Sequence, residues 1–156
     1  ADRWSDEAPT SSVFTLGDGD EVNTDTEDYI AYCFTGKQGY SKFGSYTGNG
    51  DADGTFVYTG FKPAFVVTKY TSPSGGVGDW NMYDNKRKGY NDENDYLAAN
   101  TTSAENSSDN QVDLLSNGFK WRATDSDTNE DGSTYVYMAF AEAPLVNSNG
   151  VPCNAR

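Results

Sequence analysis

Short runs of aromatic and β-branched residues follow one another along the chain, and in most of them apolar and polar side chains alternate. Alternation every second residue predicts β-strands with one buried face. No segment sustains the apolar period of about 3.6 residues that marks a long amphipathic helix. The predicted strands cover residues 13–16, 29–34, 40–46, 56–58, 64–70, 80–83, 111–115, 119–121 and 135–141. The pattern therefore predicts an all-β protein, an antiparallel β-sandwich of the jelly-roll type.

Three local signals refine this picture. Residues 64–70 form the most continuous apolar run, so we expect a central strand that is buried on both faces. The dipeptide Asn117-Gly118 predicts a tight hairpin between the two strands that flank it. Residues 96–99 interrupt a long polar stretch, and the pattern fits either a short strand or a single helical turn.

The end of the chain repeats its beginning. Phe14 is followed by an acidic loop and then by the run YIAYCF over residues 29–34. Phe119 is followed by a similar loop, one residue longer, and then by the run YVYMAF over residues 135–140. Self-similarity of this kind indicates repeated structural modules. We therefore expect an N-terminal arm over residues 1–36 that resembles the back half of a second module, a sandwich over 37–144, and a tail over 145–156.

Composition and charge narrow the class of protein. The 156 residues fit one domain with an arm, and the 11 Tyr and 8 Phe supply buried area for a thin sandwich. The net charge of -13 argues against nucleic acid and anionic membranes as partners, because both repel an acidic surface. No apolar stretch approaches the roughly 20 residues of a membrane-spanning helix, so membrane insertion is not expected.

Histidine is absent, which excludes His-dependent catalytic triads and ordinary zinc sites. Two loops instead carry oxygen ligands at alternate positions before a glycine, the opening of a calcium loop. Both lack the glutamate that closes such a loop, and Asp, Asn and Gly also make ordinary turns. The candidate metal ligands are Asn49, Asp51 and Asp53 in the first loop and Asp127, Asn129 and Asp131 in the second. Apart from calcium, no cofactor is expected.

Two further features concern modification. Asn100 and Asn106 begin triplets that match the N-glycosylation pattern, although such triplets also arise by chance in a chain rich in Asn, Ser and Thr. The two cysteines, Cys33 and Cys153, are too few for a disulfide framework, and their positions favour unpaired thiols. A disulfide between neighbouring chains remains an alternative.

Several stretches resemble a module that recurs in virion proteins of tailed phages, particularly environmental ones. The resemblance extends in order over nearly the whole chain, and it carries no catalytic residues. It rests on residues 4–17, 39–50 (GYSKFGSYTGNG), 60–69 (GFKPAFVVTK), 80–87 (WNMYDNKR), 100–105 (NTTSAE), 114–120 (LLSNGFK) and 135–144 (YVYMAFAEAP). It implies a structural or tail-fibre-like protein, located in a virion or outside the cell.

The favoured hypothesis is a non-enzymatic structural subunit of a phage tail fibre or extracellular filament. A partial module exposes strand edges that need a partner, so we expect self-association, as a homo-oligomer or helical filament, by exchange of residues 1–36. The alternative is a carbohydrate- or receptor-binding module that stacks an exposed Trp or Tyr against a cell-surface glycan. A glycan-degrading enzyme would need a pair of carboxylates, and the sequence singles out none.

Overall fold

The computed structural model describes residues 3–71, 78–88, 91, 95–108 and 112–142, and the statements below concern these residues. The chain divides into two compact units at the bond between Phe34 and Thr35. We call the described residues before this bond the N-terminal unit and those after it the module. The elements are α1 (Asp20–Asn23), β1 (Ser41–Thr47), β2 (Phe56–Tyr58), β3 (Pro63–Tyr70), β4 (Trp80–Asp84), β5 (Leu97–Ala98), β6 (Val112–Leu115), β7 (Gly118–Trp121) and β8 (Thr134–Ala141).

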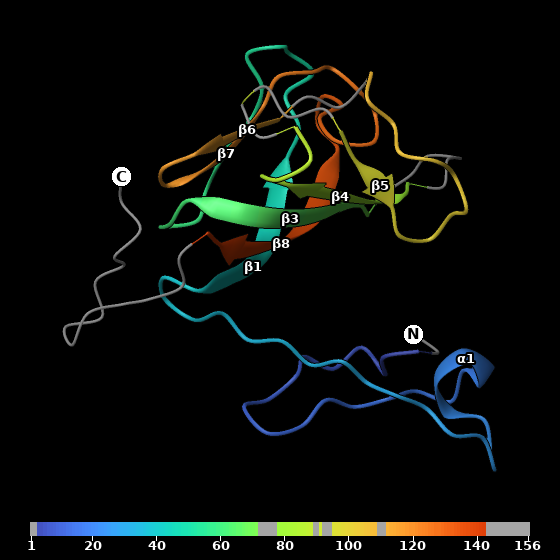
Figure 1. Ribbon diagram of the computed structural model, residues 1–156. Coiled ribbons are helices and arrows are strands. Elements are labelled where there is room, and N and C mark those ends of the chain that lie inside the picture. The colour runs from blue at the N-terminus through green and yellow to red at the C-terminus, as the bar shows by residue number, and fades with distance from the viewer. Residues whose placement is uncertain (1–2, 72–77, 89–90, 92–94, 109–111, 143–156) are drawn as a thin grey trace. The chain divides into compact units, whose positions relative to one another are not determined.

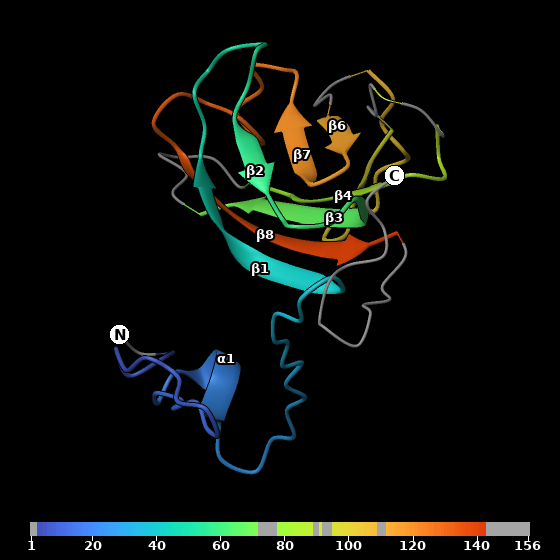
Figure 2. The ribbon, with the colours of Figure 1, turned by 90° about the vertical axis from the view of Figure 1, so that its left-hand side faces the viewer.

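The module is an antiparallel β-sandwich, as the alternation predicts. One sheet has five strands in the order β1-β8-β3-β4-β5, and the other has three in the order β2-β7-β6. Figures 1 and 2 show the three-stranded sheet stacked on the five-stranded one. The first strand pairs with the last and the second with the last but one, in alternate sheets, which makes the sandwich jelly-roll-like. The position of β3 between β8 and β4 confirms the central strand predicted for the apolar run, whereas Phe65 and Lys69 on its outer face are only half-buried, so burial on both faces is incomplete.

Aromatic side chains from both sheets fill the space between them. Tyr135 on β8 is fully buried and stacks on Tyr46 of β1 and Tyr70 of β3, with ring centroids 5.0 Å and 5.1 Å apart. Trp121 and Phe119 on β7 face these rings from the other sheet and are also fully buried. Large rings bury much area per residue, so a thin sandwich with a low hydrophobic fraction still has a continuous core.

The predicted hairpin forms between β6 and β7, with its turn one residue earlier than the dipeptide indicates: Ser116 and Asn117 make the turn, and Gly118 begins β7 opposite Leu115. Gly118 is required by a close approach, because a Cβ built there would lie 2.2 Å from the carbonyl oxygen of Val57 on β2. Residues 97–98 form the two-residue edge strand β5, which decides the choice left open by the sequence.

The predicted strands at residues 13–16 and 29–34 are wrong for this structure. In the N-terminal unit the single regular element is α1, a helix of 4 residues, and residues 29–34 have no strand pairing among the described residues. A strand satisfies its N–H and C=O groups through a neighbour, and the unit provides none. The sequence repeat is therefore not matched by a repeat of strands within the chain.

Candidate functional site

The two candidate calcium loops lie next to each other, and the side chain of Asn129 joins them. Asn129 is fully buried, and its Oδ1 accepts a hydrogen bond of 3.1 Å from the backbone N–H of Asn49. Its Nδ2 lies 3.0 Å from Asn49 Oδ1, 2.9 Å from the Asp51 carbonyl oxygen and 3.0 Å from the Ala123 carbonyl oxygen. The sequence reasoning named these residues but missed this arrangement, in which Asn129 holds the loops together.

The other candidate ligands in the first loop are also hydrogen-bonded. Asn49 Oδ1 accepts from the N–H of Asp51, and Asp51 Oδ1 accepts from the N–H of Asp53 at 2.7 Å. Asp53 Oδ1 lies 2.6 Å from Lys120 Nζ, and this hydrogen bond lowers the pKa of the Asp53 carboxyl group. Among the described residues no group of three or more His, Cys, Asp or Glu side chains is placed to hold a metal ion. A calcium site in these loops stays a prediction.

The hydrogen bonds around Asn129 compete with metal ligation, so millimolar calcium is expected to shift the melting temperature by less than about 1 °C relative to EDTA. Differential scanning fluorimetry, with magnesium as the control for ionic strength, measures this. A rise of several degrees with calcium alone, abolished by Asp51→Asn, would show that the loops do bind the ion.

Asp127 is the carboxyl group in the second loop with the most perturbed surroundings. Partial burial, followed by the negative charges of Asp125 and Asp79, raises its pKa, and Lys69 opposes this shift. A raised pKa in the folded state means that the charged form is disfavoured at neutral pH and that stability is gained as the pH falls through the folded pKa. The sequence gave no indication that this acid is partly buried.

Asp127→Asn is therefore expected to stabilise the protein at pH 7, by less than about 1 kcal/mol because the group is only half-buried and solvent screens the neighbouring charges. The gain should shrink as the pH falls, since the wild-type carboxyl group then becomes neutral as well. Urea denaturation at pH 7 and pH 4 measures it, with the exposed Asp28→Asn as the matched control. A gain that is equal at both pH values would contradict the argument.

Both glycosylation candidates are in the module. The Asn100 side chain accepts a hydrogen bond from the N–H of Trp80 and donates one to Asp79, each 2.9 Å long. Asn106 is half-buried, and its Oδ1 accepts from the N–H of Ser108 within its own triplet. Asn100 thus joins two chain segments through its amide, and glycosylation at either residue stays a prediction.

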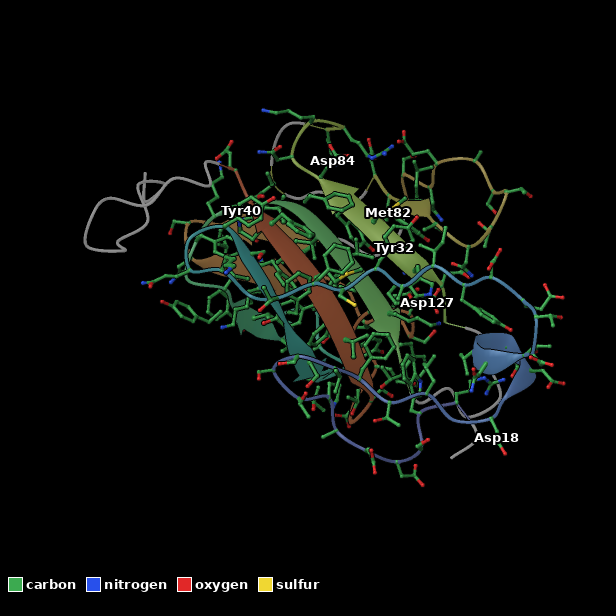
Figure 3. The ribbon with its side chains drawn as sticks, turned by 90° about the horizontal axis from the view of Figure 1, so that it is seen from below. Asp18, Tyr32, Tyr40, Met82, Asp84 and Asp127 are labelled. Carbon is green, nitrogen blue, oxygen red and sulfur yellow. The ribbon has the colours of Figure 1, made fainter. Side chains whose placement is uncertain are left out.

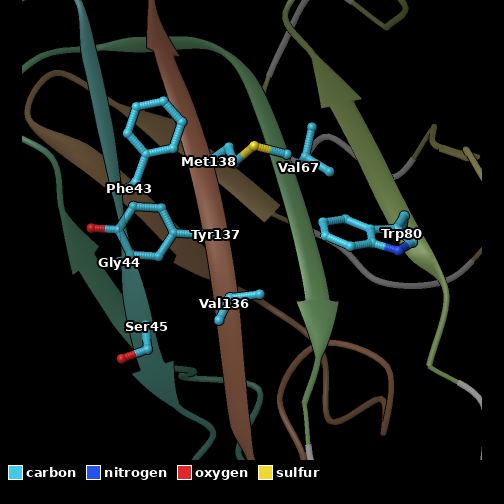
Figure 4. A pocket seen from close by; sticks show the side chains of 8 residues that line it. All are labelled: Phe43, Gly44, Ser45, Val67, Trp80, Val136, Tyr137 and Met138. Atoms are coloured by element: carbon cyan, nitrogen blue, oxygen red, sulfur yellow. The ribbon is translucent and has the colours of Figure 1, made fainter. Parts of the chain in front are cut away.

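A shallow groove of about 510 Å³ lies on the outer face of the five-stranded sheet, the face turned away from the three-stranded sheet. Phe43, Val67 and Met138 form its apolar floor, and Trp80 of β4 stands at one side (Figure 4). Met82 and Asp84 project from β4 on the same face (Figure 3). The groove offers an aromatic ring and aliphatic side chains, which bind apolar surfaces or the faces of sugars.

The tryptophans differ in their environments. Trp121 is fully buried in the core, whereas Trp4 is 58% exposed in the N-terminal unit. Trp80 is half-buried, and the Lys69 ammonium group lies 5.6 Å from its ring centroid. Of the three tryptophans, Trp121 is explained by core packing, and Trp80 is the one that lines the groove.

The most exposed apolar surface belongs to residues 29–34, which we call the 29–34 segment. Ile30 and Tyr32 are each 80% exposed, Phe34 is 59% exposed, and Cys33 is exposed as a free thiol. Large apolar side chains exposed side by side mark an interaction site. The sequence had placed this segment in a strand, and the structure adds that its side chains are uncovered.

Comparison with known proteins bears on the whole of this arrangement. The model of one protein family, described as "Domain of unknown function (DUF7483)", matches residues 1–144. The chain belongs to the DUF7483 family. The family match includes the 29–34 segment, the loops around Asn129 and the groove, so these features lie within one family domain. No curated protein and no solved structure matches the chain.

The helical content of the DUF7483 domain bears on whether it can cross a bilayer. Among the described residues, no helix is long and apolar enough.

Proposed function

We propose that this protein is a non-enzymatic structural subunit of a phage tail fibre or other extracellular filament, assembled through β-strand contacts with neighbouring modules. The observation that carries the proposal is the 29–34 segment. All six of its residues (YIAYCF) are apolar, so both faces of an extended strand would be apolar, and its large side chains are exposed. A segment of this composition gains buried area and backbone hydrogen bonds when it joins a sheet. Another copy of the chain is the simplest source of such a neighbour.

The acidic surface agrees with this proposal, because net charge keeps a repetitive structural protein soluble outside its assembly. The resemblance to modules of tailed-phage virion proteins supplies the phage part of the proposal. A head-to-tail contact between copies does not close on itself, so it would build a filament rather than a small ring or dimer.

The test is the assembly state of the full chain. Sedimentation velocity and negative-stain electron microscopy should show concentration-dependent oligomers or filaments for the wild type. The double variant Ile30→Asp/Tyr32→Asp should remain monomeric. Phe56→Asp/Tyr58→Asp, which replaces two exposed residues of β2, is the matched control and should still assemble. A wild-type chain that stays monomeric at several hundred micromolar would overturn the proposal.

A carbohydrate-binding module remains the second candidate, and the groove with Trp80 favours it. Exposed aromatic rings stack on sugar faces, and Ser45 adds a hydroxyl group at the groove wall. A glycan array followed by titration of any bound sugar tests this function. Trp80→Ala should then weaken binding at least about 10-fold, while Trp4→Ala should leave it unchanged.

A further inference from the structure

The hydrogen bonds of the N-terminal unit repeat those of the module in the same register. In the module the Tyr135 hydroxyl donates to the carbonyl oxygen of Ser126, nine residues earlier, at 2.6 Å, and accepts from the N–H of Glu130, five residues earlier, at 3.0 Å. Tyr29 makes the same two bonds, with the residues nine and five positions before it, at 2.8 Å and 3.0 Å. Tyr29 and Tyr135, which the sequence repeat aligns, are therefore equivalent in their hydrogen bonds as well.

The loops before these tyrosines match as well. Asn129 donates from Nδ2 to the carbonyl oxygen of Ala123, six residues earlier, and from its backbone N–H to Asp125, four residues earlier, at 3.0 Å and 2.8 Å. Asn23 makes both bonds with the residues six and four positions before it, each at 3.0 Å. The loop of the N-terminal unit thus already has the conformation that precedes β8 in the module.

The matching residues differ in one respect, which is burial. In the module these positions are fully buried, and in the N-terminal unit they are not. The pairs are Phe119 at 0% and Phe14 at 38%, Trp121 at 0% and Leu16 at 36%, Tyr135 at 0% and Tyr29 at 46%, and buried Ala139 and exposed Cys33. In the module, the opening half with β1 to β5 contributes Tyr46, Tyr70 and Tyr83 to the cover of these rings. The N-terminal unit has no counterpart of this half among the described residues.

We infer that the 29–34 segment is the closing strand of a second module, and that its partner is an opening half equivalent to residues 37–111. In register with β8, Tyr29, Ala31 and Cys33 would point into that module's core, as Tyr135, Tyr137 and Ala139 do here. Both edges of the segment would pair, one with an equivalent of β1 and one with an equivalent of β3. The inference rests on the proposed function in taking this segment as the assembling strand, and it names what the strand binds.

The side chain of Asn23 indicates which hydrogen-bonding groups the partner offers. Asn129 binds the backbone and side chain of Asn49 and the carbonyl oxygen of Asp51, all in the loop after β1. Asn23 is exposed, and its side-chain bond among the described residues is the one to Gly17. Its Oδ1 and its second N–H therefore fit a loop like residues 48–54, following a strand like β1.

The closed module of a second copy fits this role less well than an open half-module does. Its slot between β1 and β3 already holds β8, paired along both edges. The residue that would replace Tyr137 is Ala31, which is too small to fill the space of a ring that packs on Phe119 at 5.5 Å and over Gly44. The preferred partner is thus an open half-module, whose slot between the equivalents of β1 and β3 is not filled by a β8.

Thiol reactivity of Cys33 tests the inference in the full chain. An extended chain carries a copy of residues 37–111 directly before Ala1, and Cys153→Ser removes the other thiol throughout. We expect Cys33 to react with a disulfide reagent at least about 100-fold more slowly in the extended chain than in the 156-residue chain, because it takes the buried place of Ala139. Ala31→Tyr in the extended chain should slow the reaction further, by restoring the ring over Gly44.

A matched pair of substitutions tests which face of the segment points into the core. In the extended chain Tyr29→Ser should restore fast labelling, since Tyr29 takes the place of the buried Tyr135, whereas Tyr32→Ser at the place of half-buried Met138 should keep Cys33 protected. The inference is overturned if Cys33 reacts equally fast in both chains, with and without Ala31→Tyr. It is also overturned if the 156-residue chain alone protects Cys33 as strongly as the extended chain does, because a second copy would then serve as well as an open half-module. A chain that merely fails to assemble would defeat the proposed function and leave this test unaffected.

Discussion

Tyr135→Ala is expected to lower the free energy of unfolding by about 4 kcal/mol. The ring is fully buried between Tyr46 and Tyr70, so its loss leaves a cavity that the rigid strands on either side fill poorly. The hydroxyl group is lost as well, which leaves the Glu130 N–H and the Ser126 carbonyl oxygen without their partner. Urea denaturation followed by tryptophan fluorescence measures the change.

Two variants separate these contributions. Tyr135→Phe keeps the ring and should cost about 1 to 2 kcal/mol, the share of the two hydrogen bonds. Tyr29→Ala removes the matching residue of the N-terminal unit, where the ring is 46% exposed, and should change the stability of the module by less than about 0.5 kcal/mol. Equal losses for Tyr135→Ala and Tyr29→Ala would contradict the view that the two units differ in burial.

The sandwich could be predicted because its strands carry their own signals. Residues 64–70 form an apolar run long enough for a central strand. The dipeptide Asn117-Gly118 signals the hairpin between β6 and β7, although the turn itself lies at Ser116 and Asn117. Residues 29–34 carry an equally strong signal, yet they form no strand. A strand depends on its neighbour, so a local pattern predicts only that a segment suits a sheet and not whether a sheet is there to join.

The candidate site shows the same limit in a different form. The spacing of Asp, Asn and Gly in two loops predicted oxygen ligands for calcium. A sequence cannot show that the side-chain oxygens of Asn129 and Asn49 instead accept hydrogen bonds between the loops. Asn81 is a second example, a fully buried polar residue on β4 whose amide has no hydrogen-bond partner among the described residues. Its place in an alternating strand predicts that it faces the core and gives no reason for a polar side chain there.

The outer-face groove could not be predicted because its residues come from four strands that are distant in the sequence. Phe43, Val67, Trp80 and Met138 meet through the strand order β1-β8-β3-β4. Each lies at an alternating position of its own strand, so the sequence places each on one face of a sheet. The neighbours on that face follow from the pairing, which depends on the fold as a whole.

Asn129→Ala is expected to lower the free energy of unfolding by about 3 kcal/mol. The substitution removes one acceptor and the amide donors that hold residues 49–53 against residues 123–130, and it leaves the N–H of Asn49 without this partner. Asn23→Ala is the matched control, because Asn23 has the same local hydrogen bonds but is exposed. Among the described residues its side chain bonds to the Gly17 carbonyl oxygen and not to a second loop. Its effect on the module should be below about 0.5 kcal/mol, as measured by urea denaturation of both variants. A small effect of Asn129→Ala would mean that other contacts hold the two loops together. It would also remove the reason to expect that Asn23 binds a loop like residues 48–54 in a partner.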